Sequence, residues 1–157
     1  MKLIACALTS VLLAGAGIGT PQPFSLSILG PQGPLKHGSL VELTVTLTNR
    51  SVGEIVIRDR NRSCDYELEV RESSGQPAPG TSYKRALKCS NKFAVTAGKN
   101  SIRNLRPGES YSDSMIVNQL YDLSRPGKYT IQASRAIPQE LGGGTVQSNI
   151  ITLTVTP

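Results

Sequence analysis

The clearest pattern in the chain is a strict alternation of apolar and polar residues between Val41 and Asn49. Four apolar side chains, those of Val41, Leu43, Val45 and Leu47, alternate there with Glu or Thr. A period of two residues places the apolar side chains on one face of a β-strand and the polar ones on the other. The pattern therefore predicts a strand with one buried face and one solvent-exposed face.

Shorter segments along the chain show the same kind of alternation. Turn residues such as Gly, Pro, Asn and Ser separate them, and no segment has the 3.6-residue apolar period of an amphipathic helix. This arrangement predicts an all-β fold, an immunoglobulin-like antiparallel β-sandwich of about 7–9 strands. Besides the segment above, strands are expected at residues 24–28, 55–57, 66–70, 114–117, 129–134 and 149–156.

The pattern is less regular between Thr81 and Asn104. One or two short edge strands are expected there, around residues 83–87 and 93–96.

The sequence before Tyr129 has the features of a structured corner. It runs Asp122-Leu-Ser-Arg-Pro-Gly127-Lys and is followed by a predicted strand. It resembles the corner before strand F of immunoglobulin-like folds. There the hydroxyl of a Tyr at the start of the strand forms a hydrogen bond with the backbone a few residues upstream. The resemblance implies a structural corner formed by Asp122, Gly127 and Tyr129. Because Ile131 stands where an antibody domain carries its second Cys, the intersheet disulfide of antibodies has no counterpart here.

The first residues have the composition of a secretory signal peptide. Lys2 precedes an apolar run at residues 3–13, and small residues follow at 14–16. We predict a signal peptide over residues 1–19, a single domain over 20–157, and a secreted or periplasmic location. Neither this run nor any later one is long enough to span a bilayer, so no transmembrane segment is expected. An alternative is lipid attachment at Cys6 in the sequence Leu-Ile-Ala-Cys, which is disfavoured because Cys6 precedes most of the apolar run.

Of the three cysteines, Cys6 lies in the predicted leader and Cys64 and Cys89 remain. An even pair in an exported, oxidising setting predicts a disulfide between Cys64 and Cys89. The alternative is a pair of buried free thiols.

Positive charge gathers in one part of the chain. The formal net charge is +6, and removal of residues 1–19 takes away only Lys2, which leaves 16 cations against 11 acids, or +5. Residues 84–106 hold seven cations and no acid, and the predicted disulfide would bring them near a second basic group before Cys64. Such a surface attracts an anionic partner, here a protein or an anionic envelope polymer, without specific nucleic-acid recognition. The alternative is a set of scattered, solvated cations. The candidate anion-contact surface consists of Arg58, Arg60, Arg62, Lys84, Arg85, Lys88 and Lys92.

Catalytic chemistry has little support in the sequence. His37 is the one histidine, so any His-dependent triad requires it and a multi-histidine metal site is excluded. Asp65, Glu67 and Glu69 fall on one face of a predicted strand and could form a Ca²⁺ or acid/base site, but a solvated outer face is favoured because strand alternation explains every residue in the segment. We expect no catalytic residue, no cofactor and no metal.

Two segments, Asn49-Arg-Ser51 and Asn61-Arg-Ser63, match the N-glycosylation pattern. The match has meaning only if the source has a eukaryotic secretory pathway.

Three turn-rich motifs resemble the β-rich propeptides of deuterolysin-type metalloproteases and BsuPI-type proteinase inhibitors. They are Leu105-Arg-Pro-Gly-Glu-Ser110, Tyr121-Asp-Leu-Ser and Gly127-Lys-Tyr-Thr-Ile-Gln-Ala133. The resemblance implies an immunoglobulin-like fold and, as an alternative function, proteinase inhibition through residues 73–81 or 135–144. The chain has no H-E-x-x-H sequence, which excludes the protease itself, and no Trp for the Trp-containing BsuPI motif.

Overall fold

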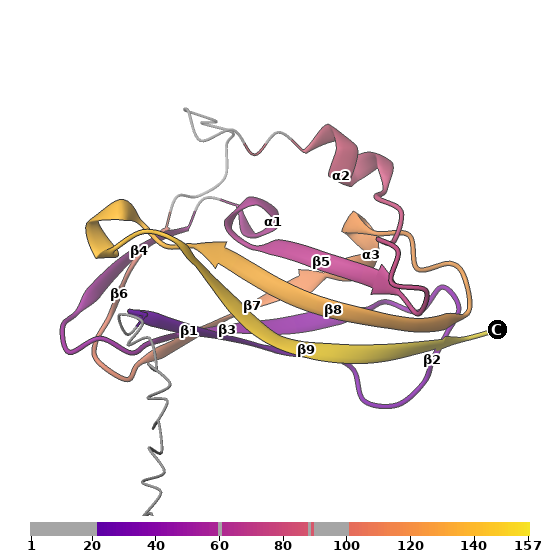
Figure 1. Ribbon diagram of the computed structural model, residues 1–157, viewed down its shortest axis with the longest axis horizontal. Coiled ribbons are helices and arrows are strands. Elements are labelled where there is room, and N and C mark those ends of the chain that lie inside the picture. Colours follow the sequence, from indigo (N-terminus) through magenta and orange to yellow (C-terminus); the bar gives the residue numbers. More distant parts are fainter. Residues whose placement is uncertain (1–21, 60, 88, 90–100) are drawn as a thin grey trace, which may run out of the picture.

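The computed structural model describes residues 22–59, 61–87, 89 and 101–157. These residues form the predicted immunoglobulin-like, mainly antiparallel β-sandwich (Figure 1). One sheet has the strand order β1-β3-β7 and the other the order β2-β9-β8-β5, while β4 and β6 form a separate two-stranded ribbon. The strands are β1 (Phe24–Leu29), β2 (Leu35–Lys36), β3 (Glu42–Asn49), β4 (Ile55–Asp59), β5 (Glu67–Glu72), β6 (Ser101–Leu105), β7 (Ser110–Ile116), β8 (Gly127–Ala136) and β9 (Thr145–Thr156).

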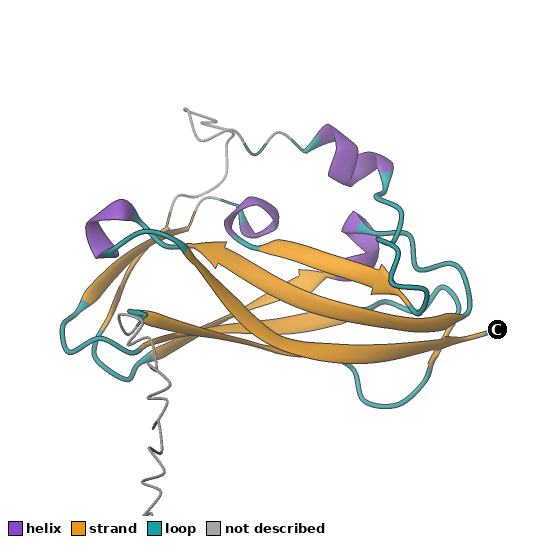
Figure 2. Cartoon of the chain, in the orientation of Figure 1, coloured by secondary structure: helices purple, strands orange, loops and turns teal. Residues whose placement is uncertain are grey.

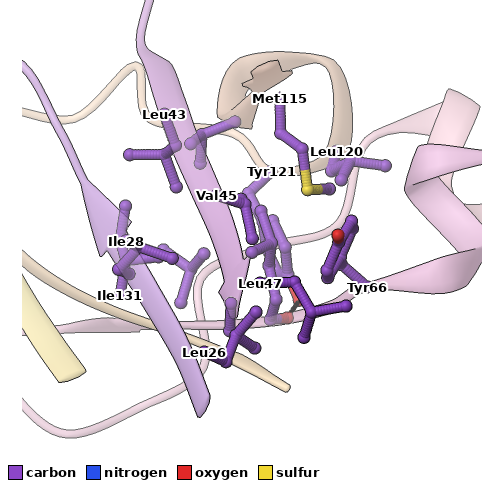
Figure 3. Close-up of a cluster of buried hydrophobic side chains, with 14 of the residues drawn as sticks. Leu26, Ile28, Leu43, Val45, Leu47, Tyr66, Met115, Leu120, Tyr121 and Ile131 are labelled. Atoms are coloured by element: carbon purple, nitrogen blue, oxygen red, sulfur yellow. Dashed lines mark hydrogen bonds between the residues drawn. The ribbon is translucent and has the colours of Figure 1, made fainter. Parts of the chain in front are cut away.

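The strand with the clearest alternation, β3, occupies the middle of the first sheet between β1 and β7. Leu43, Val45 and Leu47 have no exposed surface, which confirms the predicted buried face. In Figure 3 these side chains pack with labelled residues of β1, β7 and β8 and with Tyr66, so the core lies between the two sheets. Labelled there are Leu26, Ile28, Leu43, Val45, Leu47, Tyr66, Met115, Leu120, Tyr121 and Ile131.

The N-terminal part of the domain passes from one sheet to the other. β1 pairs antiparallel with β3, whereas β2 pairs parallel with β9. Gly30 lies at the crossing, where a Cβ would come within 2.7 Å of Ile151 Cδ1 and 3.2 Å of Leu43 Cδ2. A larger residue would require the end of the Ile151 side chain to shift, so the crossing is closely packed.

Asn149 of β9 joins the two sheets at the same edge. Its Nδ2 donates to the Ile28 carbonyl at 3.0 Å, and its Oδ1 accepts from the Ile28 N–H at 2.8 Å. The side-chain amide thereby satisfies both backbone groups of Ile28, which point away from β3.

Short helical segments lie around the strands rather than in a layer of their own (Figure 2). The prediction of an edge strand at residues 83–87 is wrong, because this segment forms most of α2. Thr81 starts that helix, since its Oγ1 accepts from the Lys84 N–H at 3.1 Å. The second expected edge strand, at residues 93–96, lies outside the described residues. The helices are α1 (Arg62–Asp65), α2 (Ser82–Ala86), α3 (Val117–Leu120) and the 3₁₀ turn η1 (Gln139–Leu141).

No helix in the described residues combines the length and apolar character needed to cross a membrane. The predicted signal peptide, residues 1–19, lies outside the described residues.

Candidate functional site: cations beside a disulfide

A disulfide joins Cys64 in α1 to Cys89 after α2, with a Cα–Cα distance of 5.2 Å. It ties the α2 segment to the end of the second sheet, beside β5. Both cysteines line a cavity of about 340 Å³, together with Tyr66, Leu87 and Tyr121 among others. The disulfide therefore forms part of a recess in the surface rather than an isolated surface link.

Four members of the predicted anion-contact surface belong to elements along one side of the sandwich. Arg58 is on β4, Arg62 on α1, and Lys84 and Arg85 on α2. Figure 1 shows α1 between β4 and α2 on the upper side of the molecule. We refer to these four residues as the cationic row. The other predicted members, Arg60, Lys88 and Lys92, lie outside the described residues.

Three members of the cationic row make contacts within the protein. Arg62 Nε lies 2.9 Å from Oδ1 of Asp113, although the Arg62 side chain is 62% exposed. Lys84 Nζ lies 3.6 Å from the ring centroid of Tyr121, a cation–π contact that fixes α2 to the end of α3. Arg85 Nη1 donates to the Gly80 carbonyl. These contacts hold the cations in place and offset part of the charge of Arg62.

Arg58 and Arg85 are exposed but line different cavities. Arg58 lies at a cavity of about 440 Å³ whose lining includes the carboxylates of Asp65, Glu67 and Glu140. Arg85 lies at another cavity of about 440 Å³, together with Lys36. The structure thus places the predicted cations along one side without gathering them into a single compact patch.

Arg135 of β8 forms a largely buried charge network that the sequence did not indicate. Its Nη2 lies 3.2 Å from Asp59 Oδ1, and Arg103 Nε lies 3.3 Å from Asp59 Oδ2. The side chains of Asp59 and Arg135 are 13% and 11% exposed. Asp59 thereby pairs with two arginines from separate strands. Because these residues are far apart in the chain and follow no motif, only the tertiary structure reveals the network.

Tyr66 lies against this network, with its ring centroid 4.9 Å from the Arg135 guanidinium carbon. Burial raises the pKa of Tyr66 to about 12, although the charge of Arg135 acts in the opposite direction. The Tyr66 hydroxyl and Arg135 Nη1 are both buried and find no hydrogen-bond partner among the described residues.

The segment before β8 contains a tyrosine corner. The Tyr129 hydroxyl donates to the Arg125 carbonyl at 2.8 Å. Asp122 Oδ1 accepts from the Ser124 N–H at 2.9 Å, and hydrogen bonds from Ser124 lower the pKa of Asp122. Gly127 has a φ of 155°, a conformation that favours glycine. The structural role of all three residues is thus local shaping of the turn into β8.

The acidic residues singled out in the sequence do not share one strand face. Glu67 and Glu69 lie on the exposed face of β5, but Asp65 belongs to α1. Glu69 also pairs with Arg71, whose Nε donates to Glu69 Oε1 at 2.6 Å. Among the described residues, no group of three or more His, Cys, Asp or Glu side chains is arranged to hold a metal ion.

The two glycosylation-type segments differ in accessibility. Asn49 is fully buried, and its Nδ2 donates to the carbonyls of Gly53 at 2.7 Å and Leu105 at 2.9 Å. Asn61 is exposed, and its Oδ1 caps α1 by accepting from the Ser63 N–H at 3.0 Å. The first segment is therefore structural, because its amide hydrogens are used within the fold.

Comparison with known proteins places the chain in no family. No family model matches it, and no curated protein matches its sequence. The deuterolysin-type and BsuPI-type resemblances therefore have no support from a family match.

Two solved structures of the CARDB domain of one Pyrococcus furiosus protein are similar in shape. The crystal structure, in complex with di-metal ions, has a TM-score of 0.43 at 14% identity and covers 84% of this chain and 91% of that domain. The solution NMR structure has a TM-score of 0.40 at 14% identity and covers 85% and 94%. At these values the likeness is too distant to transfer ligands or function.

Proposed function

We propose that the chain is an exported, non-catalytic binding domain, cleaved after residue 19, that contacts an anionic macromolecule along the cationic row. The partner is a protein or an anionic envelope polymer. The observation that supports this most directly is the placement of Arg58, Arg62, Lys84 and Arg85 on β4, α1 and α2, along one side of a domain with net positive charge.

The α2 end of the cationic row is expected to contribute more than the β4 end. Three carboxylates share the cavity beside Arg58 and offset its charge. The cavity beside Arg85 contains Lys36 and one acid, Asp122. Since nearby opposite charges cancel over less than a Debye length, the local potential is more positive around Arg85.

A binding experiment with poly-L-glutamate tests the proposal. The exported protein should bind the polymer at about 0.05 M salt, and the variant Arg58→Glu/Arg85→Glu should bind at least about tenfold more weakly, because reversal adds repulsion where there was attraction. The matched control is Arg50→Glu/Lys128→Glu, which changes net charge equally at exposed sites outside β4, α1 and α2. Equal losses in the two variants would show that net charge alone is responsible. Absence of binding by the unaltered protein would contradict the proposal directly.

Proteinase inhibition has less support, because both long loops use their backbone within the fold. An inhibitory loop that mimics substrate presents extended backbone to the protease. Instead, the Ile137 N–H donates to the Gly144 carbonyl at 2.9 Å around η1, and Ile137 is buried. In the other loop, the Ala78 N–H donates to the Val70 carbonyl at 2.8 Å, and Ala78 is buried too.

A further inference from the structure

The cavity of about 440 Å³ that contains Arg85 has the form of a binding site. Its lining includes the buried apolar residues Val41, Leu123 and Val155, whereas its polar lining comes from β2 and the loop after it, from α2 and its N-cap, and from α3 and the segment after it. A recess of this size, lined by apolar residues and a few polar groups, is typical of a small-ligand site.

Positive charge predominates around this cavity. Lys36 and Arg85 of the lining carry full positive charges. Lys36 makes no ion pair with any described residue. The one acid in the lining, Asp122, accepts from the Ser124 N–H at 2.9 Å and from the Ser124 side chain, and these hydrogen bonds lower its pKa and keep it ionised. Two cations against one carboxylate leave the lining with an excess of positive charge, which attracts an anion from solution.

Hydrogen bonds hold the walls of the cavity in place. Asn118 links the Ser39 carbonyl at 2.8 Å with the Val41 N–H at 2.9 Å. The His37 N–H donates to the Thr156 carbonyl at 2.8 Å, and the Thr81 N–H donates to the Leu120 carbonyl at 3.0 Å. Because the backbone around the cavity is fixed before a ligand arrives, little ordering is required for binding.

We propose that this cavity binds an oxyanion, a carboxylate or phosphate group, between Lys36 and Arg85. Charge complementarity favours this class of ligand, since each cation offers hydrogen-bond donors to anionic oxygen. The inference deepens the proposed function, because it names the chemical group that the α2 end of the cationic row recognises. Its test is nevertheless independent of the test of that function, because it uses small anions in place of a polymer.

The test is an NMR titration of the exported protein with sodium phosphate, with sodium acetate and with sodium chloride at matched ionic strength. Phosphate and acetate should shift the backbone amides of Lys36, Thr81 and Ser124 in a saturable manner, and chloride should not. Tighter binding of phosphate would assign the site to phosphate-bearing ligands, and tighter binding of acetate to carboxylates. Identical shifts with chloride, or none with either oxyanion, would overturn the proposal.

Variants make the test specific to the cavity. Lys36→Gln/Arg85→Gln should weaken oxyanion binding at least about tenfold, because two charge-assisted contacts are lost. The matched control Arg50→Gln/Lys128→Gln should leave it unchanged, since neither residue lines the cavity. All four side chains belong to exposed residues, so an unchanged melting temperature should show that both variants fold. Equal weakening in the two variants would contradict the site. Oxyanion binding without polymer binding would retain the cavity and reject the macromolecular partner.

Discussion

Single side chains decide how the polar interior of this domain is arranged. Tyr66 and Tyr129 are both buried, yet only the Tyr129 hydroxyl has a hydrogen-bond partner among the described residues. Substitution of Tyr66 should therefore measure the free-energy cost of burying a hydroxyl beside a charge network. Substitution of Tyr129 should measure how much a hydrogen-bonded corner contributes to stability.

Tyr66 should make the domain unstable at alkaline pH. Its pKa is about 12 in the folded protein against 10.0 in an unfolded chain, so folding favours the protonated form. The stabilisation is complete below pH 10 and is lost as pH rises through 12, by an amount on the order of 2 to 3 kcal/mol. The free energy of unfolding, measured against pH for the unaltered protein and Tyr66→Phe, should diverge over this range. Parallel curves would show that Tyr66 does not titrate with folding.

Loss of the Tyr129 hydroxyl should destabilise the domain. Tyr129→Phe removes the donor to the Arg125 carbonyl and is expected to cost about 1 to 3 kcal/mol, because that carbonyl loses its buried partner. Denaturant unfolding measures the change. Tyr83→Phe serves as the control, since Tyr83 is exposed and should give no shift. An unchanged midpoint for Tyr129→Phe would mean that the corner bond contributes nothing to stability.

At the scale of elements, the sequence predicts strands well where one face is buried and the other is exposed to solvent. β3 and β5 show this, since every second residue of β3 is buried and Leu68 and Val70 are the buried residues of β5. β6 was not predicted because its pattern is inverted: Ile102 is exposed, whereas Arg103 reaches Asp59 and stacks on Tyr111. A residue that pairs with a distant charge in place of apolar neighbours leaves no alternation to detect.

α2 and the sites near it show the same limit. Five residues are too few for a helical period, and its start depends on one capping contact from Thr81. Composition indicated the cations of the row. It did not indicate that Lys36 and Arg85 line one cavity or that Asp59 pairs with Arg135, because these residues are far apart in the chain. The order of the strands in the sheets brings such residues together, and this order cannot be read from a single sequence.

The disulfide is the element-scale contact with the largest expected effect. Cys64 and Cys89 close a loop with a sequence separation of 25 residues, which corresponds to about 3 to 4 kcal/mol in the chain-entropy picture. Reduction, or the variant Cys64→Ser/Cys89→Ser, should lower the free energy of unfolding by about that amount. Thiol titration of the unfolded, unreduced protein provides the check on oxidation. Two free thiols per chain would contradict the disulfide in the exported protein.

For the whole molecule, charge governs the expected interactions. The net positive charge attracts any polyanion weakly, whereas a row of cations on one side gives orientation to the encounter. Charge reversal at any exposed cation reduces the attraction that comes from net charge. Only reversal within the cationic row removes the contribution that comes from position.

Salt should weaken polyanion binding steeply. Between about 0.05 and 0.2 M salt the Debye length falls to below about 10 Å, which is comparable with the spacing of surface charges. Affinity for poly-L-glutamate, measured by fluorescence anisotropy across this range, should fall continuously. Affinity that does not change with salt would mean that apolar contacts dominate and that the cationic row is a solvated surface.

The position of the disulfide also bears on what remains of the protein after a protease cuts it. The covalent loop between Cys64 and Cys89 encloses β5, the exposed turn at Ser73–Gly75 and α2. Exposed turns of this kind are preferred sites of proteolytic nicking. A single cut there leaves two fragments joined through sulfur, with β5 still paired to β8. A nicked molecule would migrate as one band on a non-reducing gel and as two after reduction, and it would keep the α2 end of its binding surface attached.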